Sequence, residues 1–453
     1  MIILLKCRFL SVGTYKCVGL SVPFPARRSS NSNVKLIHML LLRPSSSTSL
    51  YLGSPFPQSI VILRPVNYQF HVSKGSRFLS TQAGRTRRKM GITNSNGEQT
   101  YDRTTEVKQF DDSKIGVKGL VDSGITSIPR FFVHPPETLP SVSPTPKSFS
   151  DVIPTVDLSG ITSNRRIIIV DQIREASHEL GFFQIINHGI PSGVLNRTIA
   201  AVKGFNEQPT EVKSWYYGRG MSRGVAFSTN FDLFQSKAAS WRDTIQLRFG
   251  SVAPDYDSIP EICRKELIEW DQHITRLGET LMEILCEGLG LDAGKLKELM
   301  CLDERIAVAH YYPYCPQPDL TYGITSHTDP GALTVLVQNE IGGLQVKHGE
   351  DWVDVKPIAG ALVINIGDLL QIISNDEYRS VEHRVLANPF PEARVSIASF
   401  FNPSRREDLY GPLPELVSAK KPALYRQFTF NEYLRRFFSK ELDGKSLINY
   451  FKF

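Results

Sequence analysis

Residues 326–338 read Ser-His-Thr-Asp-Pro-Gly-Ala-Leu-Thr-Val-Leu-Val-Gln, and residues 381–385 read Val-Glu-His-Arg-Val. Apolar and β-branched side chains surround both signals, so the sequence predicts β-strands here. In a strand, residues i and i+2 point to the same face, so we expect His327 and Asp329 to project together. A second imidazole, His383, follows 54 residues after Asp329, from a distant strand. The stretch therefore predicts two imidazoles and one carboxylate that converge.

These residue types are those of a metal site beside an anion-binding site. Two His and one carboxylate on one face of a metal form the facial triad of non-heme Fe(II) oxygenases, which leaves coordination positions open. Arg394 and Ser396 again share one face of a predicted strand. A guanidinium is the natural partner of a buried carboxylate. Because the chain has ten His, each of these short motifs is weak evidence alone. The interpretation depends on their order along the chain, which is His327-x-Asp329, then His383, then Arg394-x-Ser396.

The fold class follows from the pattern after residue 303, where short β-rich runs are separated by Gly, Pro, Asn and Asp. The expected strands are residues 307–312, 333–338, 343–346, 352–355, 361–366 and 395–401. Many short strands without intervening helices indicate a jelly roll or barrel. We therefore expect a mostly β fold with flanking helices and a distorted double-stranded β-helix (jelly roll) core.

Helical periodicity is clearest between residues 262 and 289. Apolar side chains recur there at three- and four-residue steps: Leu267, Trp270, Ile274, Leu277, Leu281 and Ile284. This spacing predicts a support helix that faces the core. Further elements are expected as a strand start at 153–158, a helix at 165–180, a strand at 181–191 and a helix at 430–440.

The chain divides by composition and periodicity into six segments. They are a leader at 1–89 without expected order, an N-terminal arm and linker at 90–150, an α/β region at 151–260, support helices at 261–302, the jelly roll at 303–403 and a C-terminal helical segment at 404–453. The Pro- and Ser-rich part of the linker spans residues 140–146. We expect it to be exposed at the surface.

The leader differs from the rest in charge. Residues 1–97 carry 14 of the 52 Lys and Arg but no Asp or Glu, so the remaining chain has a net charge of −8. An acid-poor, Arg- and Ser-rich leader is typical of an organelle transit peptide, for a chloroplast or a mitochondrion. The alternative is an extended gene model with translation from Met90, which would leave the protein in the cytoplasm. Residues 90–95 then fit a short myristoylation pattern.

Several partner classes are disfavoured by composition. A mildly acidic body gives no electrostatic footprint for nucleic acid. No apolar run approaches the roughly 18–20 residues of a membrane span. The six Cys form no CxxC or regular framework, which indicates free thiols in a reducing compartment. We expect a monomer that acts on a small molecule.

The ordered set resembles the signature of plant 2-oxoglutarate- and Fe(II)-dependent dioxygenases. The likeness extends to residues 310–318, 342–346 and 181–191, and covers about three quarters of the chain, from residue 116 onward. Within that superfamily the chain is most similar to the 1-aminocyclopropane-1-carboxylate oxidase homologues, a group that includes hydroxylases of the deacetoxyvindoline type. Residues 116–125, 230–233 and 241–244 carry this closer likeness.

The resemblance implies a role for each part of the signature. Iron would be held by His327, Asp329 and His383, and no other catalytic residue is implied. The co-substrate 2-oxoglutarate would be bound by Arg394, Ser396 and Tyr312, with O2 consumed, succinate and CO2 released, and ascorbate a candidate reductant. The substrate pocket would be lined by Phe400, Asn230, Phe231 and His310, although Phe400 can equally be read as ordinary core.

We therefore expect an oxygenase that oxidises, most simply by hydroxylation, a small specialised metabolite or hormone. One alternative is a true 1-aminocyclopropane-1-carboxylate oxidase, which makes ethylene with ascorbate and shares the same triad. Another is a catalytically silent jelly-roll protein that binds a small ligand. The residues leave open the substrate and the choice among hydroxylation, desaturation and ring closure.

Overall fold

The computed structural model describes residues 101–139, 153–251, 254–299, 301–439 and 446–453, and the backbone of two strands near the N-terminus. The chain splits into two compact units, residues 1–87 and 88–453. In the first unit, β1 (Ile3–Ser11) pairs antiparallel with β2 (Thr14–Ser21). Met90 with its myristoylation pattern and the linker at 140–146 lie outside the described residues. The interpretation of the leader stays a prediction.

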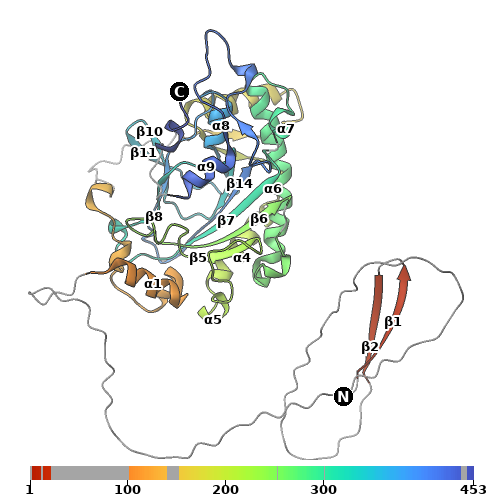
Figure 1. Ribbon diagram of the computed structural model, residues 1–453, viewed down its shortest axis with the longest axis vertical. Helices are drawn as coiled ribbons and strands as arrows, with labels where there is room; N and C mark the ends of the chain where they lie inside the picture. The colour runs from red at the N-terminus through yellow and green to blue at the C-terminus, as the bar shows by residue number, and fades with distance from the viewer. Residues whose placement is uncertain are drawn as a thin grey trace, which may run out of the picture. The chain divides into compact units, whose positions relative to one another are not determined.

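The second unit is organised around an eight-stranded sheet (Figure 1). Its strands, in spatial order, are β3 (Thr155–Asp157), β4 (Phe182–Ile186), β12 (Leu362–Ile366), β9 (Leu333–Gln338), β14 (Arg394–Asn402), β7 (Glu304–Tyr312), β6 (Asp243–Gly250) and β5 (Val225–Ser228). The β3–β4 pair is parallel, and the other neighbours are antiparallel. We call this the major sheet.

A second, four-stranded antiparallel sheet completes the β core. It runs in the order β11 (Asp351–Asp354), β10 (Leu344–His348), β13 (His383–Leu386) and β8 (Tyr322–His327). We call this the minor sheet. The expected mostly β, jelly-roll architecture is confirmed.

The two faces of β14 explain why the major sheet is covered on its outer side. Val395, Ile397 and Phe401 belong to the main apolar core. On the same face, the hydroxyl of Ser399 accepts a hydrogen bond of 3.0 Å from the Trp270 indole of the long helix α6 (Glu261–Gly288). Because strand side chains alternate, Arg394, Ser396 and their same-face neighbours point to the opposite, inner side.

Helices cover this outer face (Figure 1). The predicted apolar stripe of α6 is buried throughout, and α6 packs on α3 (Arg166–Glu179) and α4 (Ser192–Asn206). The role predicted for this helix as a core-facing support is therefore confirmed. No helix in the described part of the chain is both long and apolar enough to span a bilayer.

The N-terminal arm docks on the β core. Its helices α1 (Arg103–Ser113) and α2 (Gly116–Asp122) bring Phe110 and Val117 into a second apolar cluster around Trp241. The buried carboxylate of Asp243 on β6 accepts hydrogen bonds of 2.8 Å from the backbone N–H groups of Val117 and Lys118. This carboxylate therefore ties the start of α2 to the sheet.

The remaining elements are short. They are α5 (Thr210–Lys213), α7 (Lys295–Glu298), α8 (Asp368–Ile373), β15 (Leu409–Tyr410), β16 (Phe428–Thr429), α9 (Phe430–Phe437) and α10 (Ser446–Asn449). The helix α8 lies between β12 and β13, so the expectation that no helix interrupts the strands was wrong. The helix α8 has only six residues, fewer than two turns, and all six are buried, so its sequence is too short to reveal a helical period.

Candidate active site

Side chains from both sheets line a cavity, which we call the inner cavity. The major sheet contributes Tyr312, Thr334, Asn365, Arg394 and Ser396, and the minor sheet contributes Ile324, His327, Leu344, His383 and Val385. The strand register explains this gathering, because directly opposed residues of paired strands share a face. Thr334 lies opposite Asn365, Tyr312 opposite Arg394, and His327 opposite His383.

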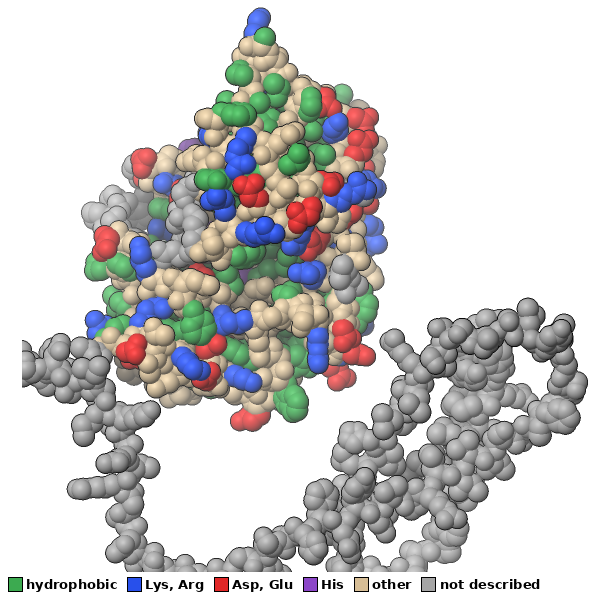
Figure 2. Space-filling view, viewed as in Figure 1, with side chains coloured by type: hydrophobic (Ala, Val, Ile, Leu, Met, Phe, Trp, Pro, Cys, Tyr) green, Lys and Arg blue, Asp and Glu red, His purple; other side chains and the backbone are tan. Residues whose placement is uncertain are grey.

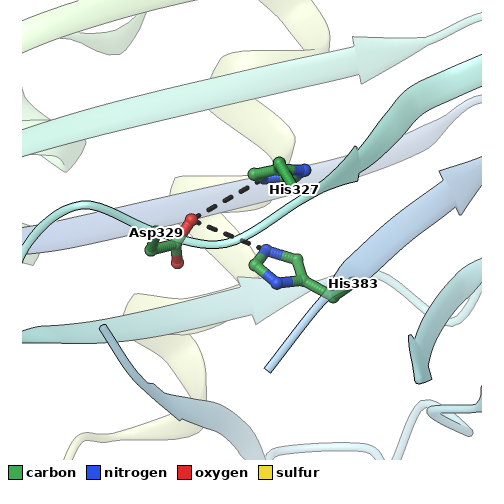
Figure 3. A group of neighbouring side chains, drawn as sticks. All are labelled: His327, Asp329 and His383. Atoms are coloured by element: carbon green, nitrogen blue, oxygen red, sulfur yellow. Dashed lines mark ion pairs between the residues drawn. The ribbon is translucent and has the colours of Figure 1, made fainter. Parts of the chain in front are cut away.

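The predicted triad converges at one end of the inner cavity (Figure 3). One ligand atom from each of His327, Asp329 and His383 lies within 4.8 Å of the other two. Asp329 Oδ1 is 3.7 Å from Nε2 of His327 and 3.6 Å from Nε2 of His383. In the described part of the chain this is the one group of three or more such side chains that could hold a metal ion.

One detail of the triad differs from the prediction. His327 is the last residue of β8, and Asp329 lies beyond the strand end rather than on its face. Pro330 follows directly and has no N–H to donate to a ladder. The i, i+2 argument was therefore wrong in its premise, although the two side chains do meet.

Asp329 is held so that one oxygen faces the imidazoles. Its Oδ2 accepts hydrogen bonds from the Thr334 hydroxyl at 2.6 Å and from the Asn365 amide at 2.7 Å. Burial alone raises the pKa of Asp329, but attraction to the two imidazoles and these two hydrogen bonds outweigh it, so the pKa is lowered. The carboxylate is therefore an anion with Oδ1 available to a cation.

Each imidazole is oriented by the backbone carbonyl two residues before it. Nδ1 of His327 is 2.9 Å from the carbonyl oxygen of Thr325, and Nδ1 of His383 is 3.2 Å from that of Val381. A carbonyl only accepts, so Nδ1 carries the proton and the lone pair of Nε2 faces the centre. Burial, followed by repulsion from His383, lowers the pKa of His327 to about 3. Both features favour a neutral imidazole that binds a metal.

The segment that carries Asp329 rests on the start of α8. The backbone N–H of Asp368 donates to the carbonyl of Asp329 at 2.7 Å, and the Thr328 hydroxyl donates to the Asp368 carboxylate at 2.8 Å. The backbones approach so closely that a Cβ on Gly367 would lie 2.1 Å from the carbonyl oxygen of Gly331. Glycine is therefore required at position 367. The start of α8 fixes the position of the Asp329 backbone through these contacts.

A buried guanidinium lies at the other end of the inner cavity. Arg394 is 1% exposed and donates to the Ser396 hydroxyl at 3.1 Å and to the Gln338 amide oxygen at 2.7 Å. Its charge lies 4.9 Å from the centre of the Tyr312 ring, and its Nε has no hydrogen-bond partner. No carboxylate of the described residues pairs with it. An uncompensated buried cation is unfavourable, so this end is suited to an anion.

The comparisons with known proteins agree with this geometry. A model for the 2OG-Fe(II) oxygenase superfamily matches residues 304–403, and one described as non-haem dioxygenase in morphine synthesis N-terminal matches residues 153–261. The 1-aminocyclopropane-1-carboxylate oxidase homolog 1 of Arabidopsis thaliana is 47% identical over 356 residues, which is 78% of this chain and 97% of that protein. The chain belongs to the 2OG-Fe(II) oxygenase superfamily.

Further relatives agree with this assignment. Deacetoxyvindoline 4-hydroxylase of Catharanthus roseus is 43% identical over 77% of this chain and 88% of its own length. The crystal structure of JOX2 in complex with 2OG, Fe and JA has a TM-score of 0.65 at 30% identity and covers 75% of this chain and 97% of that chain. The oxygenase is therefore a dioxygenase that uses Fe(II), 2-oxoglutarate and O2, as the resemblance implied.

The predicted pocket residues fall into two groups. His310, Phe231 and Phe400 line a second cavity of about 510 Å³, which we call the outer cavity. It meets the inner cavity at His310, Ile324, His327, Asp329 and Phe400. Asn230 is not among its lining residues, because its buried amide bonds both the N–H and the carbonyl of Ser240. Its place in the substrate pocket therefore stays a prediction.

Other residues of this oxygenase's site escaped the sequence analysis. Thr334, Asn365 and Gln338 stand at inner-facing strand positions, but an isolated polar residue in a strand does not reveal its partner. The alternation of β6 does carry a signal, because Ile245, Leu247 and Phe249 enter the core while Thr244, Gln246 and Arg248 line the outer cavity. That period of two predicts a strand with one polar face.

Proposed function

We propose that this oxygenase holds Fe(II) through Nε2 of His327 and His383 and through Oδ1 of Asp329. The observation that carries the assignment is the convergence of the three ligand atoms within 4.8 Å. Imidazole and carboxylate are a donor set that Fe(II) accepts. The hydrogen bonds at Asp329 Oδ2 and at both Nδ1 atoms support it further, because they leave only the three converging atoms free to bind a metal.

We propose that Arg394 and Ser396 bind the distal carboxylate of 2-oxoglutarate, with Tyr312 beside them. Arg394 provides a fixed charge, and the Ser396 hydroxyl 3.1 Å away can donate its own proton to a carboxylate. Burial raises the pKa of the Tyr312 hydroxyl, so it remains protonated and able to donate. These groups orient the co-substrate toward the triad across the inner cavity.

The residues around the two cavities orient the reactants and exclude water. Fe(II), when bound with 2-oxoglutarate and O2, supplies the oxidation that releases succinate and CO2. The apolar side chains of Ile324, Leu344 and Val385 line the inner cavity on the side of the minor sheet. Asp329 and the imidazoles remain fixed through their hydrogen bonds to the sheets.

We propose that the substrate is a small specialised metabolite or hormone and that the reaction is a hydroxylation. The relatives support this class, because they include a deacetoxyvindoline hydroxylase, the JOX2 structure with JA and a rice dioxygenase for auxin oxidation. The outer cavity, at about 510 Å³, falls within the usual range for small-molecule sites.

An Asp329→Ala variant tests the metal assignment. We expect it to lose Fe(II) binding in equilibrium dialysis while its far-UV circular dichroism remains that of the wild type. Asp354→Asn is the matched control, because Asp354 is a carboxylate of the minor sheet outside both cavities. Retained Fe(II) affinity in Asp329→Ala would contradict the assignment. Wild-type protein that makes ethylene with ascorbate, and no succinate from 2-oxoglutarate, would contradict the reaction.

A further inference from the structure

The outer cavity is lined by four arginines: Arg219, Arg242, Arg248 and Arg406. Three of them lie within ion-pairing distance of a carboxylate. Arg219 pairs with Asp111 at 2.7 Å, and Glu304 pairs with both Arg406 at 2.5 Å and Arg248 at 3.3 Å. Each of these three cations therefore has a carboxylate partner within the protein, although Arg248 and Arg406 share Glu304.

Arg242 differs from the other three. It is 3% exposed and takes part in none of the ion pairs seen among the described residues, although the charges of Asp232 and Asp243 act on it. Its Nη1 donates to the carbonyl of Gly323 at 2.8 Å, whereas its buried Nε has no hydrogen-bond partner. A cation in this state is stabilised by any anion that enters the cavity.

The charges of the side chains around Arg242 indicate whether a neighbouring group of the protein could serve as its anion. It precedes β6, so it lies on the same side of the sheet as Thr244, whose hydroxyl is 3.0 Å from Nδ1 of His310. Burial and the charges of Arg242 and Arg394 hold the pKa of His310 well below its usual range, so the imidazole stays neutral and Arg242 is the charged group of this pair. The carboxylate of Asp243 faces α2 instead, bound by the N–H groups of Val117 and Lys118.

The rest of the outer cavity is largely apolar. Its wall is formed by Phe231, Ile306, Phe400, Leu434, Phe437 and Phe438. Phe231 and Phe438 meet edge to face with ring centres 5.7 Å apart. Figure 2 shows a hollow on this face of the molecule, with hydrophobic side chains inside it and Lys and Arg side chains around it. An apolar skeleton fits such a wall.

We propose that the substrate is a small organic acid whose carboxylate pairs with Arg242 and whose apolar skeleton lies against this aromatic wall. The inference rests on the proposed function, since it places the substrate beside the triad. The two arginines then bind different carboxylates. Arg394 lines the inner cavity and binds the co-substrate, whereas Arg242 lines the outer cavity and binds the substrate. The wall gives shape selectivity, and Arg242 fixes which end of the acid points inward.

The test compares acids with their uncharged esters. The probes are phenylacetic, indole-3-acetic and cyclohexylacetic acid, each beside its methyl ester. They are titrated by calorimetry into the full chain loaded with Fe(II) and 2-oxoglutarate without oxygen. We expect at least one acid to bind about tenfold or more tightly than its ester, since a buried charge pair strongly favours the charged partner. Esters that bind as well as acids, or a panel in which no acid binds, would overturn the proposal.

Variants locate the effect. Arg242→Gln is expected to weaken acid binding by about 30-fold or more and to leave the ester within about twofold, whereas Arg242→Lys retains part of the preference. Arg248→Gln is the matched control, because Arg248 already has a carboxylate partner in Glu304, and the variant should keep the preference for acids. If Arg242→Gln weakened 2-oxoglutarate instead of the acids, Arg242 would serve the co-substrate and the proposal would fail.

The same titrations separate this proposal from the proposed function. Wild-type protein that binds neither Fe(II) nor 2-oxoglutarate would contradict the proposed function. Normal binding of both, without a preference for acids, would contradict only the role of Arg242. Because the acid–ester comparison is made on the wild type, it stands even if Arg242→Gln does not fold.

Discussion

The inner and outer cavities meet at the triad but are built in different ways. In the inner cavity the polar side chains stand on paired strands, so backbone hydrogen bonds fix Thr334 opposite Asn365 and Tyr312 opposite Arg394. In the outer cavity β6, β7 and β14 form one side, and the other side comes from α9, Phe438 and the segment around Phe231, where Phe231 and Phe438 meet through a side-chain contact. Rigid strands hold a metal and a co-substrate accurately, whereas helix ends and loops can change with the substrate.

The largest expected effect follows from removing the charge of the inner cavity. Arg394→Gln should weaken 2-oxoglutarate binding by about 100-fold or more, because a carboxylate loses its one buried cationic partner. Calorimetry with the Fe(II)-loaded protein measures this. Arg384→Gln is the control, since Arg384 is also buried and stacks on Trp352, but lies outside both cavities. An unchanged 2-oxoglutarate affinity in Arg394→Gln would remove the co-substrate from this end of the inner cavity.

A smaller effect is expected from the groups that orient Asp329. Asn365→Ala removes one of the two hydrogen bonds to Oδ2 and should lower Fe(II) affinity by about 10- to 100-fold. Asn339→Ala is the matched amide, because it also bonds a neighbouring strand but does not touch Asp329. Fe(II) competition against a fluorescent chelator compares the two variants. Equal losses in both would mean that Asn365 acts only through stability.

Much of the fold could be predicted, because strand alternation and helical periodicity are local. The run at 333–338 matches β9, and the helix expected at 262–289 matches α6 within one residue at each end. The helix α8 could not be recognised, because a buried helix of six residues has the composition of a buried strand. Strands β5 and β6 were overlooked even though β6 alternates clearly.

The sequence predicted only those site residues that belong to a recognisable motif. His327, Asp329, His383 and Arg394 meet as expected around one cavity, because each belongs to an ordered set in the sequence. Residues defined by a spatial partner could not be found in this way. Asn230 bonds Ser240 instead of lining the cavity, and Arg242 differs from the other cavity arginines in taking part in none of the ion pairs seen among the described residues.

The smallest effect should be confined to the outer cavity. Phe438→Ala removes one ring of the edge-to-face pair with Phe231, so the tightest-binding acid of the probe panel should bind about two- to tenfold more weakly. Fe(II) and 2-oxoglutarate affinities should stay within about twofold, because neither ring lines the inner cavity. Phe390→Ala is a close control, since Phe390 and Phe438 are both 54% exposed and Phe390 lines neither cavity.

The double variant Phe231→Ala with Phe438→Ala then measures whether the two rings act together. Because each ring packs against the other, removing both should weaken the probe by less than the two single effects combined. A Phe438→Ala variant that weakened 2-oxoglutarate as much as the probe would show that the two cavities are not independent. The division of the site into an inner cavity between the sheets for chemistry and an outer cavity, closed by helix and loop residues, for selectivity would then fail, whatever the role of Arg242.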